Sequence, residues 1–192
     1  NVEPGRGPFV LMTAAKLADV TLSGRIKLEQ SVENAGILLR ANTNGTENTG
    51  YEIHFDIQHN ELFIRRHAKE IKTLAKRGLR PSFGWRNFRA ELAKGEIRFW
   101  LEDGDQPLLT ARDESPIEGD GYIGIRAWGG AVRTDQLKLH LPKRDVLINE
   151  IAPSKSTDGE LVAQAQGGLA KRRALQDLCS VMFNISEFVY ID

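Results

Sequence analysis

The chain has 192 residues, enough for one domain with a single hydrophobic core and a short appendage. Its 26 basic and 26 acidic residues give a formal net charge of zero, so we expect neither nucleic acid nor an anionic membrane as a partner. The single cysteine, Cys179, excludes an internal disulfide framework, and no apolar run approaches the roughly 18 residues of a membrane span.

Short segments of alternating apolar and polar residues follow one another from about Pro8 to Leu141, separated by Gly, Asn and Asp. This spacing is typical of two antiparallel sheets packed as a sandwich. Tight turns at Gly95 and at Asp103–Gly104 predict hairpins, and therefore antiparallel pairing. The predicted strands are Phe9–Met12, Val20–Glu29, Ala35–Ala41, Gly50–Asp56, Glu61–His67, Arg86–Ala93, Glu96–Glu102, Gln106–Asp113, Gly121–Ala127 and Thr134–Leu141.

The stretch GYEIHFDIQHNELFIRRH shows the alternation most clearly. Its apolar residues within 51–57 alternate with Glu52, His54 and Asp56, as in a strand with one face in a core. Three interpretations of the second face stay open: a solvated sheet surface, a sugar-binding or catalytic row, and a metal site formed by His54 with Asp56.

One insertion interrupts the series of strands, at Ala68–Gly84. It is basic, has a weak helical pattern and ends in turn residues, which predicts a surface loop. Loops positioned by a rigid scaffold often carry specificity, so this segment is a candidate for ligand contact.

The composition changes after Leu141. A stretch broken by proline and glycine is followed by apolar residues spaced i, i+3, i+4, i+7 and i+8 between Leu175 and Phe183, which predicts an amphipathic helix. An isolated helix of this length is marginal in water, so we expect it to dock on the sandwich or on a protein partner. The expected organisation is a sandwich over 1–141, a linker over 142–168 and a C-terminal helix over 169–192.

The segments VENAGILLRAN, TGYEIHFDIQHNELFIRRH, WRNFRAELAKGEIRFWLEDGDQPLLTARD and GDGYIGIRAWGGAVRTDQLKL follow one another in an order that resembles the concanavalin A-like lectin and glucanase sandwich. More narrowly, they are similar to the 3-keto-disaccharide hydrolase domain family, over roughly Phe9 to Leu141. The resemblance implies an all-β, antiparallel two-sheet jelly roll. Related modules include glycan-binding domains, glycoside hydrolases and non-catalytic spacers.

The end of the chain, RRALQDLCSVMFNISEFVYID, resembles the last helix of large, secreted, cytochrome c-containing proteins of planctomycete type. This resemblance implies that the chain is part of a larger extracytoplasmic protein, periplasmic or secreted. No CxxCH haem-attachment motif occurs in the sequence, so a haem would lie outside it.

Arg40 and Glu52 match the arginine and glutamate of the "sGilfR" and "GYE" motifs of the resembled family, so they are the first site candidates. A structural brace between neighbouring strands is the equally open alternative for such a pair. A tryptophan near Arg and Glu suits a sugar, because a pyranose presents an apolar face to the ring. The predicted ligand-binding residues are Arg40, Glu52, His54, Arg65, Arg126 and Trp128.

Glu52 is also the candidate catalytic residue. Retaining enzymes of this fold often carry an ExDxxE strand, but here His54 replaces the middle acid and the third acid is missing, which favours binding over hydrolysis. We therefore expect a module that binds a carbohydrate or a protein partner. The alternatives are a glycoside hydrolase or 3-keto-glycoside hydrolase or lyase using Glu52, and a structural subunit of a complex. No cofactor is predicted, and a calcium ion held by loop carboxylates stays open.

Overall fold

The structure is a computed structural model and describes residues 9–43, 48–141 and 144–147. These residues form strands and connecting segments, with no helix among them. The strands are β1 (Phe9–Leu17), β2 (Val20–Leu28), β3 (Asn34–Thr43), β4 (Asn48–Asp56), β5 (Glu61–His67), β6 (Ile71–Gly78), β7 (Arg86–Ala93), β8 (Glu96–Leu101), β9 (Leu109–Arg112), β10 (Gly121–Trp128), β11 (Val132–Leu141) and β12 (Arg144–Leu147).

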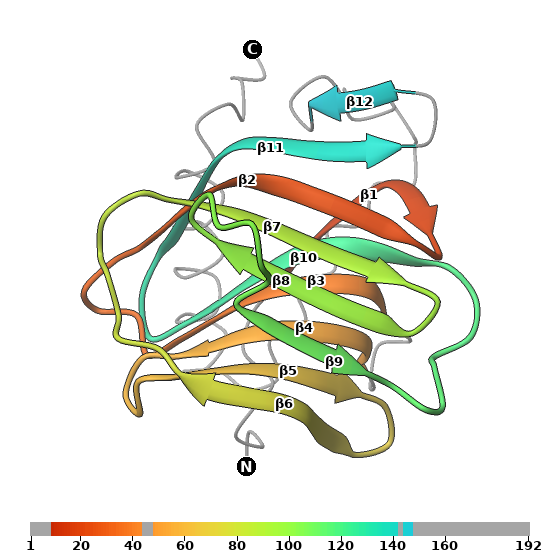
Figure 1. Cartoon of the computed structure of the whole chain (residues 1–192), viewed down its shortest axis with the longest axis horizontal. Coiled ribbons are helices and arrows are strands. Elements are labelled where there is room, and N and C mark those ends of the chain that lie inside the picture. Colours follow the sequence, from red (N-terminus) through yellow and green to blue (C-terminus); the bar gives the residue numbers. More distant parts are fainter. Residues whose placement is uncertain (1–8, 44–47, 142–143, 148–192) are drawn as a thin grey trace, which may run out of the picture.

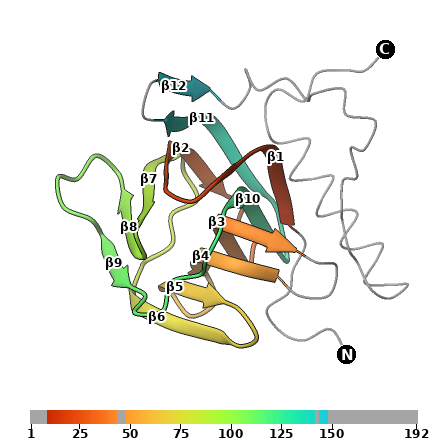
Figure 2. The ribbon, with the colours of Figure 1, turned by 90° about the vertical axis from the view of Figure 1, so that its right-hand side faces the viewer.

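The strands form two six-stranded sheets that face each other as a sandwich (Figures 1 and 2). The first sheet has the order β1-β10-β3-β4-β5-β6, and the second sheet has the order β12-β11-β2-β7-β8-β9. Paired strands run antiparallel throughout both sheets. The predicted all-β antiparallel sandwich is thus confirmed for the described residues.

The hydrophobic core lies between the sheets and follows from the alternation in the sequence. Tyr51, Ile53 and Phe55 of β4 are almost completely buried there, as is Phe99 of β8. Phe55 and Phe99 meet edge to face across the two sheets, with ring centroids 5.8 Å apart, a geometry that aromatic pairs favour. Because Tyr51, Ile53 and Phe55 point into the core, Glu52 and His54, which alternate with them, point to the opposite face of the sheet.

The structure differs from the sequence prediction in two segments. The expected loop at Ala68–Gly84 contains β6, which pairs with β5 and completes the edge of the first sheet. Its weak helical pattern was misleading, because the free edge of β5 supplies backbone hydrogen-bond partners that the sequence does not reveal. The strand β12 lies in the segment predicted as a linker and pairs with β11. The helix predicted over 169–192 lies outside the described residues.

None of the described segments is a helix long and apolar enough to cross a membrane.

Candidate functional site

The candidate site lies on the outer face of the first sheet, which we define as the side turned away from the second sheet. Strand register brings its residues side by side. Glu52 of β4 is opposite Arg65 of β5, while Arg126 of β10 and His54 of β4 are both opposite Gly36 of β3. Directly opposed residues in a sheet point to the same face, so these side chains are neighbours.

Four side chains on this face form what we call the Glu52 cluster: Glu52, His54, His67 and Arg126. One guanidinium nitrogen, Nη1 of Arg126, lies 3.0 Å from Oε1 and 3.1 Å from Oε2 of Glu52. His67 Nε2 is 2.7 Å from Oε2, and His54 Nδ1 is 3.1 Å from Oε1. Glu52 has no exposed surface at all. Because a carboxylate only accepts hydrogen bonds, both imidazole nitrogens donate to it.

Gly36 gives the Glu52 carboxylate its place. A Cβ atom built on Gly36 would overlap Oε1 of Glu52 and lie 3.0 Å from its Cδ and Cγ. A larger residue at position 36 would therefore push the Glu52 carboxylate away from its three hydrogen-bond donors, Arg126, His54 and His67. Gly36 thus leaves free the space that the Glu52 carboxylate occupies.

The Glu52 carboxyl is ionised. Burial raises its pKa, but the charge of Arg126 and the hydrogen bonds from His54 and His67 outweigh burial and hold the pKa well below its usual range. The group is therefore a fixed negative charge and a hydrogen-bond acceptor, with no proton to donate near neutral pH.

Arg65 completes the site on β5. Its guanidinium lies over the ring of Phe63, 4.3 Å from the centroid, and it makes no hydrogen bond or ion pair with a described residue. Burial lowers the pKa of Arg65, an effect that the charge of Glu52 opposes and that of Arg126 reinforces. An arginine keeps its charge in any such setting.

Trp128 lies at the end of β10, two residues beyond Arg126 and therefore on the same face. It is opposite Asn34 and 37% exposed. A large exposed aromatic beside a polar cluster offers an apolar platform to a ligand.

The expected pairing of Arg40 with Glu52 is wrong. Arg40 has a φ of 51° and lies at a register shift of β3, which removes it from the regular alternation. Its guanidinium donates instead to the carbonyl oxygens of Ala18 and Ile117. Arg40 thus braces the end of the sandwich, while Arg126 supplies the partner of Glu52.

A second buried polar network lies at the same end of the sandwich as Arg40, on the core side of the first sheet, around Tyr51. Tyr51 donates its hydroxyl hydrogen to Asp113 at 2.9 Å and accepts from the backbone N–H of Ile117 at 2.9 Å. Arg66 Nε lies 3.0 Å from the same Asp113 oxygen. Burial, followed by Asp113, raises the pKa of Tyr51 against the opposing hydrogen bond from Ile117. These contacts tie the segment after β9 to the first sheet.

The interpretation of His54 with Asp56 as a metal site is wrong. His54 Nδ1 faces Glu52, whereas Asp56 accepts from the backbone N–H and ring nitrogen of His59. No group of three His, Cys, Asp or Glu in the described part of the chain is placed to hold a metal ion.

Sequence reasoning did not include His67 among the candidate site residues. The signal was available, because His67 stands two residues after Arg65 and so shares its face once β4 and β5 pair. Sequence reasoning also assigned Gly36 no part in the site. Its role depends on register across three strands, which the sequence does not state.

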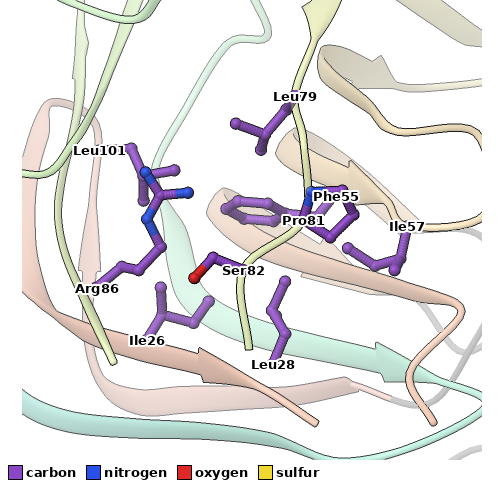
Figure 3. Close-up of a pocket in the computed structure, with 9 residues that line it drawn as sticks. All are labelled: Ile26, Leu28, Phe55, Ile57, Leu79, Pro81, Ser82, Arg86 and Leu101. Atoms are coloured by element: carbon purple, nitrogen blue, oxygen red, sulfur yellow. The ribbon is translucent and has the colours of Figure 1, made fainter. Parts of the chain in front are cut away.

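Figure 3 shows a separate pocket that the connection from β6 to β7 helps to close over the core. Phe55 and Leu101 line it from the two sheets, and Pro81 and Ser82 line it from the connection. Its free space is about 10 Å³, roughly what one water molecule needs. This pocket is too small for a sugar.

Fold and site together define a concanavalin A-like β-sandwich with a buried polar cluster on one outer sheet face. The model of the family described as "Farnesoic acid 0-methyl transferase" matches residues 13–133, and the chain belongs to this family. The narrower resemblance to the 3-keto-disaccharide hydrolases is not confirmed. None of the curated proteins matches the sequence significantly.

Solved structures share the fold at low sequence identity. A carbohydrate-binding module from Bacillus subtilis superposes with a TM-score of 0.57 and 14% identity, over 66% of this chain and 78% of the module. Sheep galectin-11, in complex with glycerol, gives 0.51 and 6% identity over 70% and 98%. Chicken galectin 2 gives 0.50 and 9% identity over 71% and 100%.

Proposed function

We propose that the protein is a sugar-binding β-sandwich whose binding surface is the outer face of the first sheet around Glu52. The observation that carries the proposal is the Glu52 cluster itself. An ionised carboxylate, a guanidinium and two imidazoles are held in one buried network on the face away from the core, where the core gains nothing from them. The names of the carbohydrate-binding module and the galectin of the same fold support it.

The network suits recognition of hydroxyl groups. Sugar hydroxyls both donate and accept, and two half-buried polar side chains are available to them: His67 within the cluster and Arg65 beside it. Because Glu52 is fixed by three partners, its neighbours are held in one arrangement before a ligand arrives, which lowers the entropic cost of binding. Trp128 adds the apolar platform that a sugar ring needs.

The geometry favours binding over glycoside hydrolysis. A general acid must carry a proton, whereas the pKa of Glu52 lies well below its usual range. A retaining or inverting mechanism also needs a second carboxyl group facing the first across the sugar. Among the described residues, Arg126, His54 and His67 are hydrogen-bonded to Glu52, so both oxygens of its carboxylate are already engaged by fixed partners.

The family description names a methyl transfer, which requires a site for a methyl donor beside the acceptor group. Among the described residues, the pocket of Figure 3 has room for about one water molecule, and the Glu52 cluster is filled by its own contacts. Neither of these two places therefore has room for such a donor.

The test is a glycan array followed by calorimetry on the best oligosaccharide. Trp128→Ala should weaken binding about tenfold, since it removes the apolar platform. Trp85→Ala is the matched control, because Trp85 is 40% exposed but lies under Arg25 of the second sheet, 5.0 Å away. Binding that is lost equally in both variants, or no binding to any glycan, would overturn the proposal.

A further inference from the structure

Three neighbouring strands of the first sheet are buried on both of their faces. The buried runs are residues 35–41 of β3, 50–55 of β4 and 123–127 of β10. Alternate residues of these runs face the second sheet and form the core, whereas the outer face of an antiparallel sheet commonly faces water. Unbroken burial along these strands therefore indicates that something lies over the outer face.

Leu38 of β3 shows that its neighbours in the sheet do not supply this shielding. It alternates with the core residues Ile37 and Leu39 and so points outward, yet it is only 9% exposed. Gly36 lies two residues earlier on the same face, and Gly124 of β10 is directly opposite, so two of its neighbours have no side chain. An apolar side chain in this position is buried only when other residues lie over it.

Charged groups on the same face are shielded in the same way. The side chain of Arg126 is 7% exposed, and its buried Nε has no hydrogen-bond partner. On the outer face of the second sheet, the side chains of Arg89 and Arg98 are 47% and 41% exposed. Trp100 is buried on that face, but there the guanidinium of Arg89 covers its ring at 3.8 Å.

The described strands do not supply the cover of the first sheet. They all belong to the two sheets, and the second sheet lies on the core side (Figure 2). The structure holds a single chain, so the cover belongs to that chain, outside residues 9–43, 48–141 and 144–147. Residues 44–47 and 142–143 are too few to span three strands, and residues 1–8 contain Val2 as their one large apolar side chain apart from proline. The segment that remains is 148–192.

We propose that the amphipathic segment within residues 169–192 docks on the outer face of the first sheet, over β10, β3 and β4. Its apolar residues between Leu175 and Phe183 form one stripe when the segment is helical. Such a stripe is about 12 Å long, and three neighbouring strands span roughly 10 Å, so the two surfaces match in size. Residues 148–168 extend over at most about 70 Å, which is ample for this placement.

The docked segment and a sugar compete for one face. This consequence rests on the proposed function, because the Glu52 cluster lies among the shielded residues of β4 and β10. The apparent affinity for a sugar is then reduced by the fraction of molecules in which the face is open. The C-terminal segment thus regulates access to the site.

The first test measures where the segment lies in the full chain. Cys179, the one cysteine, is replaced by Ser, and Asp177→Cys carries a nitroxide spin label, because position 177 is on the polar side of the predicted helix, opposite the stripe. Backbone amide signals should broaden on β10, β3 and β4 and much less on β7 and β8, since stacked sheets lie about 10 Å apart. Broadening that is absent, or that gathers on another surface, overturns the proposal.

The second test releases the segment. Leu178→Asp combined with Met182→Asp places two charges on the apolar stripe, which should abolish the broadening and raise the affinity for the best oligosaccharide of the glycan array about tenfold in calorimetry. Ser180→Asp combined with Asn184→Asp is the matched control, because it adds the same two charges on the polar side, and it should change neither quantity.

The outcomes separate the docking from the proposed function. Broadening on β10, β3 and β4 with no glycan bound by the wild type or by the released variant leaves the docking intact and overturns sugar binding. Glycan binding without this broadening overturns the docking and leaves sugar binding intact. Equal affinity of the wild type and the released variant overturns the competition.

Discussion

Arg126 of β10 and Glu52 of β4 form a buried ion pair that bridges β3, the strand between them. The pair passes over Gly36, the residue of β3 that has no side chain to obstruct it. Sheet faces turned away from a core usually carry solvated charges of little energetic value. This pair is different, because Glu52 is fully buried and the Arg126 side chain is 7% exposed, so each charge depends on the other for compensation.

Removing the carboxylate should destabilise the fold. Glu52→Ala leaves the Arg126 charge buried without its partner, and breaking a buried pair in this way typically costs about 3–5 kcal/mol. Urea denaturation measures the loss in the free energy of unfolding. A double-mutant cycle with Arg126→Ala should show that the two losses are not additive. A loss below about 1 kcal/mol, as for exposed pairs, would contradict the burial of the pair.

Gly36→Ala should act on the cluster from the neighbouring strand. The added methyl group overlaps the Glu52 carboxylate, which three donors hold in place, and overpacking of this kind costs about 1–3 kcal/mol. Gly78→Ala is the control within the same sheet, since the nearest atom to a Cβ there is 4.0 Å away. Thermal unfolding of both variants gives the comparison, and equal melting temperatures would contradict the role assigned to Gly36.

The low pKa of Glu52 predicts acid sensitivity. The folded protein keeps this carboxyl ionised, so its contribution to the free energy of unfolding is fully present above the ordinary value of 4.5. Below that value the unfolded chain takes up the proton first, and the contribution is lost as the pH falls toward the folded-state pKa. The stability difference between the wild type and Glu52→Gln should therefore shrink in acid. A difference that stays constant across this range would show that the pKa is not lowered.

Tyr51→Phe should weaken the end of the sandwich. Without the hydroxyl, Asp113 loses a donor and the N–H of Ile117 loses its acceptor, and an unsatisfied buried polar group costs about 1–3 kcal/mol. Tyr122→Phe is the matched control on the other face, where Lys16 lies 5.1 Å from the ring centre. Denaturation midpoints decide the matter: losses of equal size in the two variants would contradict the account of the Tyr51 network.

The sequence predicts the sandwich and most of its strands, because period-2 alternation and turn residues depend on near neighbours in the chain. It also places Glu52, His54, Arg65 and Arg126 on outward positions. It fails for Arg40, whose left-handed backbone at a register shift breaks the alternation. It also fails for β6, because the edge of a partner strand decides that element. The C-terminal docking helix, the extracytoplasmic location and a bound calcium ion stay predictions.

We propose that a sugar binds on the outer face of the first sheet. Backbone amide shifts in a nuclear magnetic resonance titration with the strongest oligosaccharide from the array test it most directly. We expect the shifts to gather on β3, β4, β5 and β10, around Gly36, Glu52, Arg65 and Trp128, while β7 and β8 of the second sheet stay unchanged. Shifts that gather on β7 and β8, around Trp100 and Arg89, would contradict it.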